Sequence, residues 1–380
     1  MLLKDLRFDK IKSNFLLLLL SVLLLDVSPL LTIICFFLLL IRNINKKHIV
    51  LGGLIFALLL LTMVSFAYNG VSNELVTIHN AIWYTVPSVI AFLIGLNICN
   101  KIKDQRYLYL WFFMMAFVLA LPHVIVTVAD IMHTGLVNAE RHLSVFGETD
   151  EQRATTARTV ELSLAISGIG MLLLKNKTQE KYIKLFIMLS VLAELCTLHY
   201  VSRTGVVLFL LAILIGIIAL QKFSRKSLFI IISLLLLLWL FQDSSMFKVF
   251  ADREIDGSNF ADAGGRTDRW TLGFSMLLAS PNGYNIEGWY AHNFWLDFGR
   301  EGGLFAFYML VIFSIYILIT TIKIQRSKSL NINIKFCVLL FSIIFIATLF
   351  TEPVHSGARM YMYFYFMFSG MVVTLKKLYV

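Results

Sequence analysis

Two arginines and a histidine stand out as residues able to do chemistry. Arg266 and Arg269 lie three positions apart behind a Gly-Gly pair, and His292 follows them, close to the start of an apolar run. A guanidinium group is planar and binds phosphate or carboxylate oxygens through two parallel hydrogen bonds. An imidazole accepts a proton near neutral pH, as the activation of a hydroxyl group requires. These residues predict a site for an anionic ligand with a general base beside it.

Polar residues that follow His292 have helical spacing. Asn293, Asp297 and Glu301 lie at i, i+4 and i+8 and so share one helix face, where an acidic neighbour is placed to orient or tune the imidazole. A structural, hydrogen-bonded histidine is the competing interpretation. The nearby arginines favour the functional one.

A short polar segment supplies a third arginine. Ser202 and Arg203 lie in a tight turn between two apolar runs, and this turn leaves the arginine little room to move. Preorganised positive charge of this kind suits a phosphate ligand.

Further charged candidates lie at the ends of other apolar runs. Glu352 and Arg359 bracket the last predicted outer turn. Arg158 lies three residues before Glu161, a spacing typical of an ion pair within one helix, so it ranks below Arg203 as a ligand-binding residue.

Membrane helices are the elements that must position these residues. The chain has 380 residues, 59% hydrophobic and 15% charged, whereas soluble domains have about 25% charged residues. Apolar runs of about 17–25 residues recur from Phe15 to Leu375, each long enough to cross a hydrocarbon layer of about 30 Å. Because the backbone cannot bond to water in lipid, a helical bundle is expected. The four cysteines lie in or at the ends of apolar runs and are expected to be packing residues.

Lysine marks one side of the membrane. The short polar gaps alternate between lysine-rich and lysine-poor, and the positive-inside rule makes the lysine-rich gaps cytoplasmic. About twelve spans with both termini inside follow. The first two, Phe15–Leu25 and Leu30–Ile41, are short and separated by Asp26 and Pro29. A single long helix there would reverse every later loop and put the lysines outside.

Arginine marks the other side. The predicted outer segments hold one lysine and nine arginines: Arg141, Arg153, Arg158, Arg203, Arg253, Arg266, Arg269, Arg300 and Arg359. Attraction to a membrane surface needs charge alone, which lysine supplies equally well, so the preference for arginine indicates an anionic ligand. Pairing with acidic residues is the alternative for each single arginine, and solvation or pairing is expected for Arg153, Arg253 and Arg300.

The longest outer segment contains a short amphipathic helix. We divide the chain into membrane spans one to nine at 1–242, an outer loop at 243–290 and spans ten to twelve at 291–380. Within the loop a helix is predicted from Arg266 to Ala279, ended by Pro281 and Gly283. Its apolar stripe suits either the membrane interface or a lid packed on the bundle. The residues of this stripe are Trp270, Phe274, Leu277 and Leu278.

Three short motifs, in this order along the chain, carry a resemblance to a known family. They are Ser202-Arg203-Thr204-Gly205, then Gly265-Arg266 with Trp270, Pro281 and Gly283 behind it, then His292-Asn293 with Gly303 behind it. Each is a handful of residues, and it is their order and placement over about 200–310 that resembles the O-antigen ligases and O-antigen polymerases. These are bacterial polytopic membrane glycosyltransferases that act on undecaprenyl-diphosphate-linked glycans.

The resemblance implies an all-α, GT-C-type bundle with one large periplasmic loop, and an enzyme that needs neither a metal nor another cofactor. Such an enzyme transfers a glycan from undecaprenyl diphosphate to an acceptor hydroxyl with inversion at the anomeric carbon. His292 corresponds to the base, and Arg203 and Arg266 correspond to arginines that hold the diphosphate, with Arg269 in support. The preorganised guanidinium groups would stabilise the departing diphosphate without a divalent ion.

The resemblance extends to two further residues and to the setting of the protein. Arg141 resembles an outer-loop arginine of the family, although the polar stretch that often follows is replaced by 148–158, and Glu352 resembles an acidic residue near the last outer turn. The implied location is the bacterial inner membrane, with both termini cytoplasmic and the site facing the periplasm. The implied partners are the lipid-linked glycan, membrane lipid and a chain-length regulator protein, and no nucleic acid.

Three other functions compete with the preferred one. Polymerase and ligase share this apparatus and differ in acceptor, a second lipid-linked unit or lipid A-core, and Asp297 slightly favours the polymerase. A polysaccharide or lipid-carrier transporter belongs to another class, and such folds usually show internal repeats and polar groups near the bilayer midplane. This sequence shows no repeat between its halves. A non-enzymatic receptor is the third alternative.

Overall fold

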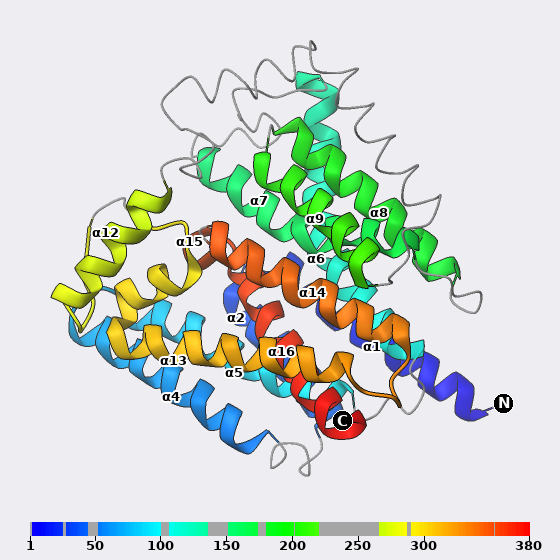
Figure 1. Cartoon of the computed structure of the whole chain (residues 1–380), viewed down its shortest axis with the longest axis horizontal. Helices are drawn as coiled ribbons and strands as arrows, with labels where there is room; N and C mark the ends of the chain where they lie inside the picture. The colour runs from blue at the N-terminus through cyan, green and yellow to red at the C-terminus, as the bar shows by residue number, and fades with distance from the viewer. Residues whose placement is uncertain are drawn as a thin grey trace.

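The computed structural model describes residues 2–25, 28–44, 52–99, 106–135, 151–173, 180–200, 202–219, 266–286, 290–352 and 354–380. Regular structure in these ranges is helical throughout (Figure 1). The predicted ninth span and the loop up to Gly265 lie outside them. The helices are α1 (Leu2–Leu23), α2 (Pro29–Asn43), α4 (Gly53–Ser72), α5 (Ile78–Ile98), α6 (Arg106–Thr134), α7 (Glu151–Ile166), η1 (Ser167–Leu173), α8 (Glu180–His199), α9 (Arg203–Ala219), α12 (Arg266–Ala279), α13 (Phe294–Gln325), α14 (Ile332–Thr351), α15 (Val354–Gly357) and α16 (Arg359–Tyr379).

Several of these helices have the length and composition of membrane spans. Five are long and apolar enough to cross a bilayer, namely α4, α5, α6 over Leu108–Met132, α13 and α14. Shorter apolar helices cover Ser13–Leu23, Pro29–Asn43, Thr159–Leu172 and Arg203–Ala219, where further spans were predicted. The described chain is therefore all-helical with the helices of a multi-pass membrane protein.

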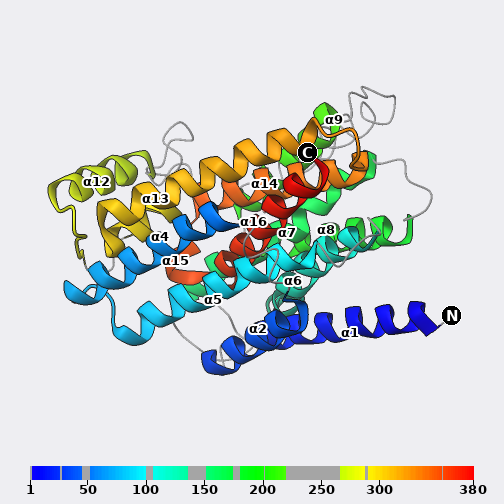
Figure 2. The same cartoon turned by 90° about the horizontal axis from the view of Figure 1, so that it is seen from below.

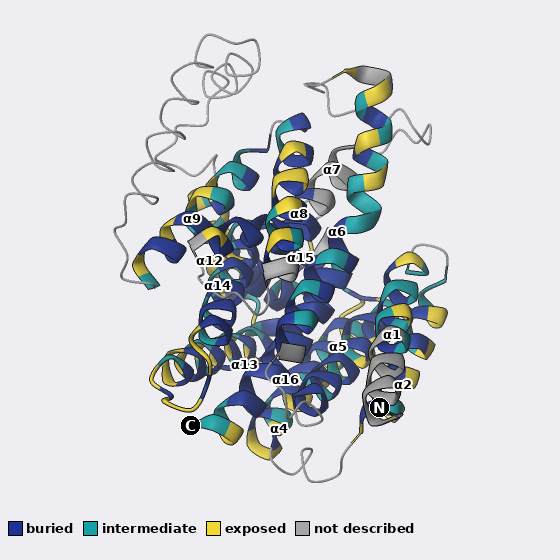
Figure 3. Cartoon of the chain, turned by 90° about the vertical axis from the view of Figure 1, so that its right-hand side faces the viewer, coloured by how far each residue is buried: buried dark blue, intermediate teal, exposed yellow. Residues whose placement is uncertain are grey.

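The longest helix shows the division between lipid-facing and buried sides most clearly. Outward residues of α13 recur every three or four positions and are 44–53% exposed: Phe305, Tyr308, Ile312, Ile315, Ile319 and Ile322. Residues between them, such as Leu310, Phe313 and Ile317, are buried. Peripheral helices are exposed on one side in the same way (Figure 3). A continuous exposed apolar stripe is unusual in water and is expected in lipid.

The first two predicted spans are separate helices, as the alternation of the lysine-rich gaps required. The α1 and α2 helices form an antiparallel hairpin, with the Thr32 hydroxyl donating to the Ser21 carbonyl at 2.9 Å near the turn. At the open end the Asn14 amide donates to the Asn43 side chain at 3.4 Å. Figure 2 shows the hairpin along the outside of the bundle, beside α5 and α6.

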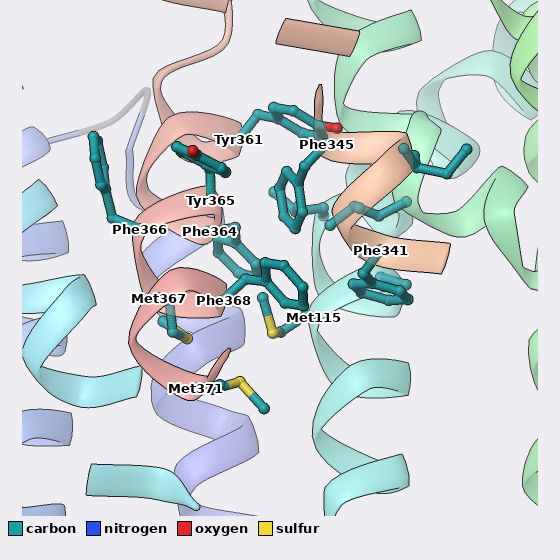
Figure 4. Packing of buried hydrophobic residues seen from close by; sticks show 14 of the residues in the cluster. Met115, Phe341, Phe345, Tyr361, Phe364, Tyr365, Phe366, Met367, Phe368 and Met371 are labelled. Carbon is teal, nitrogen blue, oxygen red and sulfur yellow. The ribbon is translucent and has the colours of Figure 1, made fainter. Parts of the chain in front are cut away.

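The centre of the bundle is α16, whose residues from Met360 to Leu375 are all buried. Its aromatic side chains pack against α14 and α6, with Tyr361, Tyr365 and Phe368 around Phe345 (Figure 4). On the opposite side α16 crosses α5 at backbone contact distance. A Cβ added at Gly370 would lie 2.7 Å from the Leu96 backbone nitrogen, so only glycine fits this crossing.

Within the described ranges, the helix ends that were predicted to lie outside and inside are named here the outer and inner ends of the bundle. At the outer end, the Asn69 amide near the C-terminus of α4 donates to the Gly302 carbonyl at 2.8 Å. At the inner end, the Thr374 hydroxyl donates to the Leu96 carbonyl at 2.9 Å and the Ser327 hydroxyl to the Tyr379 carbonyl at 2.6 Å. These contacts join predicted outer segments to each other and predicted inner segments to each other.

Candidate functional site

Glu352 joins three segments at the outer end. It follows α14 directly and is 4% exposed, and its Oε1 atom accepts a hydrogen bond from the Thr204 hydroxyl of α9. The same oxygen lies 3.3 Å from Nη2 of Arg266, the first residue of α12. This carboxylate therefore brings together the two arginine-bearing motifs and the last outer turn.

The turn before α9 is as tight as the sequence predicted. The α8 helix ends at His199 and α9 begins at Arg203, with the Ser202 hydroxyl accepting from the Gly205 backbone N–H at 3.3 Å. A Cβ added at Gly205 would contact the Thr197 side chain, so glycine allows the two helices to approach. Arg203 itself is half-buried, and in the described part of the chain it has no carboxylate within ion-pair distance.

The predicted amphipathic helix is α12, with the predicted bounds. Its apolar stripe is divided, because Leu277 is buried while Phe274 and Leu278 are 37% and 50% exposed. The Trp270 ring packs edge-on against Phe350 of α14, with centroids 4.6 Å apart. The helix is therefore a lid packed on the bundle that still presents apolar side chains outward.

His292 lies between this lid and α13. Its backbone has φ of 53°, a left-handed conformation that histidine adopts more readily than most residues. The ring is half-buried against the Tyr290 ring, with centroids 4.7 Å apart, and the Nδ1 atom is buried without a hydrogen-bond partner among the described residues. Burial, then the positive charges of Arg266 and Arg269, lower the pKa of His292 from 6.5 to about 4.

The lowered pKa determines what this imidazole can do. At neutral pH the ring is uncharged and has a free lone pair, which a general base requires. The same two arginines that keep it neutral would attract an anionic ligand to within reach of it. The imidazole and the two guanidinium groups therefore lie close enough to influence one another.

Asp297 positions His292 through the backbone, which corrects the expectation of direct contact. Its carboxylate accepts from the Ala291 N–H at 2.6 Å and from the Asn293 N–H at 3.2 Å. Asn293 caps α13 by accepting from the Leu296 N–H at 3.2 Å. The helical face predicted for these residues does not include the imidazole, because the helix begins after His292.

A kink completes the support of this segment. Gly303 has φ of 83° and divides α13 into a short outer piece and a long span. The Leu304 N–H donates to the Pro281 carbonyl at 2.7 Å, and the Tyr284 N–H donates to the Arg300 carbonyl at 2.8 Å. The chain between α12 and α13 is thus tied to α13 on both sides of the kink.

Glu301 and Arg359 belong to a second cluster, not to the one around Glu352. The Glu301 carboxylate binds Arg300 at 2.6 Å and the buried His355 imidazole at 2.9 Å. Tyr84 stacks on His355 with ring centroids 4.3 Å apart, and the Arg359 guanidinium lies 5.0 Å from the Tyr84 centroid. Arg300 is paired, as predicted, whereas Arg359 is assigned by its contacts to this cluster.

Sequence reasoning missed three histidine–carboxylate pairs, of which His355 with Glu301 is one. His199 pairs with Asp130 at 2.9 Å, both fully buried, and His123 pairs with Glu161. Glu161 was expected to pair with Arg158 within α7. Each pair joins different helices, so the only sequence signal is an ionisable residue in an apolar run.

The remaining predicted positions lie outside what the structure describes. Arg141 falls in an undescribed stretch, and Arg158 is in α7 without a described side chain. The four cysteines are buried, as expected of packing residues. Within the described ranges no group of three His, Cys, Asp or Glu residues could hold a metal ion.

The sequence was compared with protein-family models and with curated proteins. No protein-family model matches the chain, and no curated protein matches its sequence.

Proposed function

We propose that this protein is a membrane glycosyltransferase that transfers glycans from undecaprenyl diphosphate, preferably as an O-antigen polymerase. In this proposal the bundle has about twelve spans in a GT-C-type arrangement in the bacterial inner membrane. Both termini are cytoplasmic, and the outer end with the 243–290 loop faces the periplasm. The donor diphosphate lies at the membrane surface and the sugars lie under the loop.

One observation carries the proposal. A neutral, half-buried histidine with an unpaired ring nitrogen lies within electrostatic reach of Arg266 and Arg269. Through Glu352, Arg266 is linked to the turn that bears Arg203. Transfer from a lipid diphosphate needs both parts, a base for the acceptor and fixed positive charge for the leaving group.

Each residue then has a defined role in the reaction. His292 accepts the proton of the acceptor hydroxyl. At the same time the hydroxyl oxygen bonds to the anomeric carbon, from the face opposite the diphosphate. The bond from that carbon to the diphosphate oxygen breaks, and Arg203 and Arg266 stabilise the charge that develops on the leaving group. Asp297 and Asn293 hold the histidine segment in place.

Replacing His292 tests the proposal. His292→Ala should abolish glycan transfer by the purified protein, a loss of at least about 100-fold from removing a general base. Alanine is strained at positive φ, so His292→Gly, which relieves the backbone, should be equally inactive. Full activity in the glycine variant would refute the base assignment.

The matched control is His79→Ala, because His79 is an exposed histidine at the outer end whose ring accepts from Trp83 at 2.6 Å. It should retain transfer. The same assay separates the acceptors, since lipid-linked repeat units alone give a ladder with a polymerase and no product with a ligase. Protein-dependent lipid flux in liposomes without any glycan product would indicate a transporter.

A further inference from the structure

The Glu352 carboxylate pairs with the guanidinium group of Arg266. An anionic ligand would bind the same group in the proposed function. Oε1 of Glu352 lies 3.3 Å from Nη2 of Arg266 and also accepts from the Thr204 hydroxyl. Like a phosphate, the carboxylate is negatively charged and offers an oxygen that accepts hydrogen bonds. The contact is therefore a substitute for ligand binding within the protein itself.

This ion pair is loose on the arginine side. A charge-assisted hydrogen bond is normally about 2.7–2.9 Å and often bidentate for arginine, whereas Arg266 reaches Glu352 through one nitrogen at 3.3 Å. The Arg266 side chain is 24% exposed, and that of Glu352 is 5% exposed. Arg266 can therefore turn toward an incoming anion while the carboxylate stays in place.

The surroundings hold a surplus of positive charge. Arg203 begins α9, and Arg266 and Arg269 lie in the first turn of α12. Among the described residues of α9, α12 and the 352–357 turn, Asp268 is the other acid, and it is exposed. Glu352 is thus the buried negative charge of this cluster, and it becomes a like charge beside any diphosphate that binds there.

We propose that Glu352 is an exchange partner for the diphosphate: it holds Arg266 in the empty site, yields it to the ligand, and then weakens binding so that the diphosphate product leaves. The inference rests on the proposed function, because it takes that diphosphate as the ligand. Its consequence is that removing the Glu352 charge strengthens diphosphate binding and slows turnover through product release.

Direct binding tests the exchange without relying on catalysis. The full-length protein, purified in detergent, is titrated calorimetrically with inorganic pyrophosphate. Glu352→Gln keeps an oxygen for Thr204 but removes the charge, and its affinity for pyrophosphate should rise about tenfold, within the usual range of coupling between two sites. Equal or weaker binding by this variant would overturn the exchange, because Glu352 would then only support the arginine.

Two controls isolate the effect. Glu74→Gln removes a carboxylate from an exposed outer turn and should leave the affinity unchanged, which excludes bulk surface charge. Titration with dihexanoyl phosphatidylglycerol separates a lipid headgroup from a diphosphate. If Glu352→Gln raised the affinity for this phosphodiester as much as the affinity for pyrophosphate, diphosphate would be refuted as the ligand.

Further outcomes remain distinguishable. If Glu352→Gln does not fold, Arg266→Lys tests the other half of the exchange, that Arg266 is the group passed to the ligand, because an ammonium lacks the fork that holds phosphate. Its affinity should fall about tenfold, and an unchanged affinity would mean that Arg266 serves Glu352 alone. If wild type binds no pyrophosphate, the proposed function fails with the exchange, whereas binding without a gain in Glu352→Gln refutes the exchange only.

Discussion

At the scale of single residues, the site depends on charges held close together in partly buried positions. His292 is neutral because burial and two arginines oppose its protonation. Asp297 does not touch the ring and acts by fixing the backbone N–H groups on either side of it. One carboxylate, Asp297, therefore fixes the backbone on either side of His292, while another, Glu352, binds Arg266.

The lowered pKa of His292 predicts an unusual acid limit of activity. A base with a pKa of about 4 is deprotonated throughout the range above it, so kcat/KM should stay constant from pH 7 down to about 5 and fall near pH 4. Arg269→Gln removes one of the charges that lower this pKa, so the acid limb should move upward, toward the ordinary value of 6.5.

The measurement is the pH profile of glycan transfer for both proteins. Arg326→Gln, an exposed arginine at the inner end, is the control and should keep the wild-type limb. If the wild-type activity instead fell with an apparent pKa near 6.5, and Arg269→Gln did not change that pKa, the role given to His292 would be contradicted.

At the scale of elements, the site is held by a broken helix and a lid. The outer piece of α13 carries Asp297 and Glu301. The kink at Gly303 sets this piece at an angle to the long span. The α12 lid is joined to it through Pro281 and Tyr284. The second cluster ties the same piece to α15 and α5.

Substitution of Gly303 should show how much this arrangement depends on the kink. Gly303→Ala puts a Cβ 2.7 Å from the Pro281 carbonyl oxygen at a φ of 83°. A residue strained in this way costs about 1–3 kcal/mol, so the Tm measured by thermal scanning in detergent should fall and transfer should weaken. Gly53→Ala is the control, since a Cβ there meets nothing within 4 Å. A Tm equal to that of the control would contradict the strain.

At the scale of the whole molecule, the bundle separates two chemically distinct ends. Aromatic side chains of α16 fill its centre, and glycines allow α5 and α16 to cross at backbone distance. Among the described residues, Arg203, Arg266 and Glu352 meet at the outer end, whereas Ser327 and Tyr379 meet at the inner end.

Cysteine labelling should reveal which side of the membrane the outer end faces. Glu74→Cys at the outer end should react with a membrane-impermeant maleimide in intact spheroplasts, and Lys328→Cys at the inner end should react only after permeabilisation. The native cysteines are buried and provide a low background. The opposite labelling pattern would invert the topology and refute a periplasmic site.

The sequence by itself determined the features that depend on local physics. Hydropathy gave the apolar helices, and Pro281 with Gly283 gave the end of α12. Helical periodicity gave the apolar stripe of that lid, although half of it stays exposed. Each of these follows from neighbours within a few turns of the chain.

Only the tertiary structure decided which charges meet. Glu352 binds residues 148 and 86 positions away, and Glu301 pairs with a histidine 54 positions away. Helical spacing suggested that Asp297 approaches the imidazole, but the helix begins at Phe294, after His292, and the carboxylate binds the backbone instead. Contacts between distant segments depend on how the helices pack, and single-residue chemistry does not encode that packing.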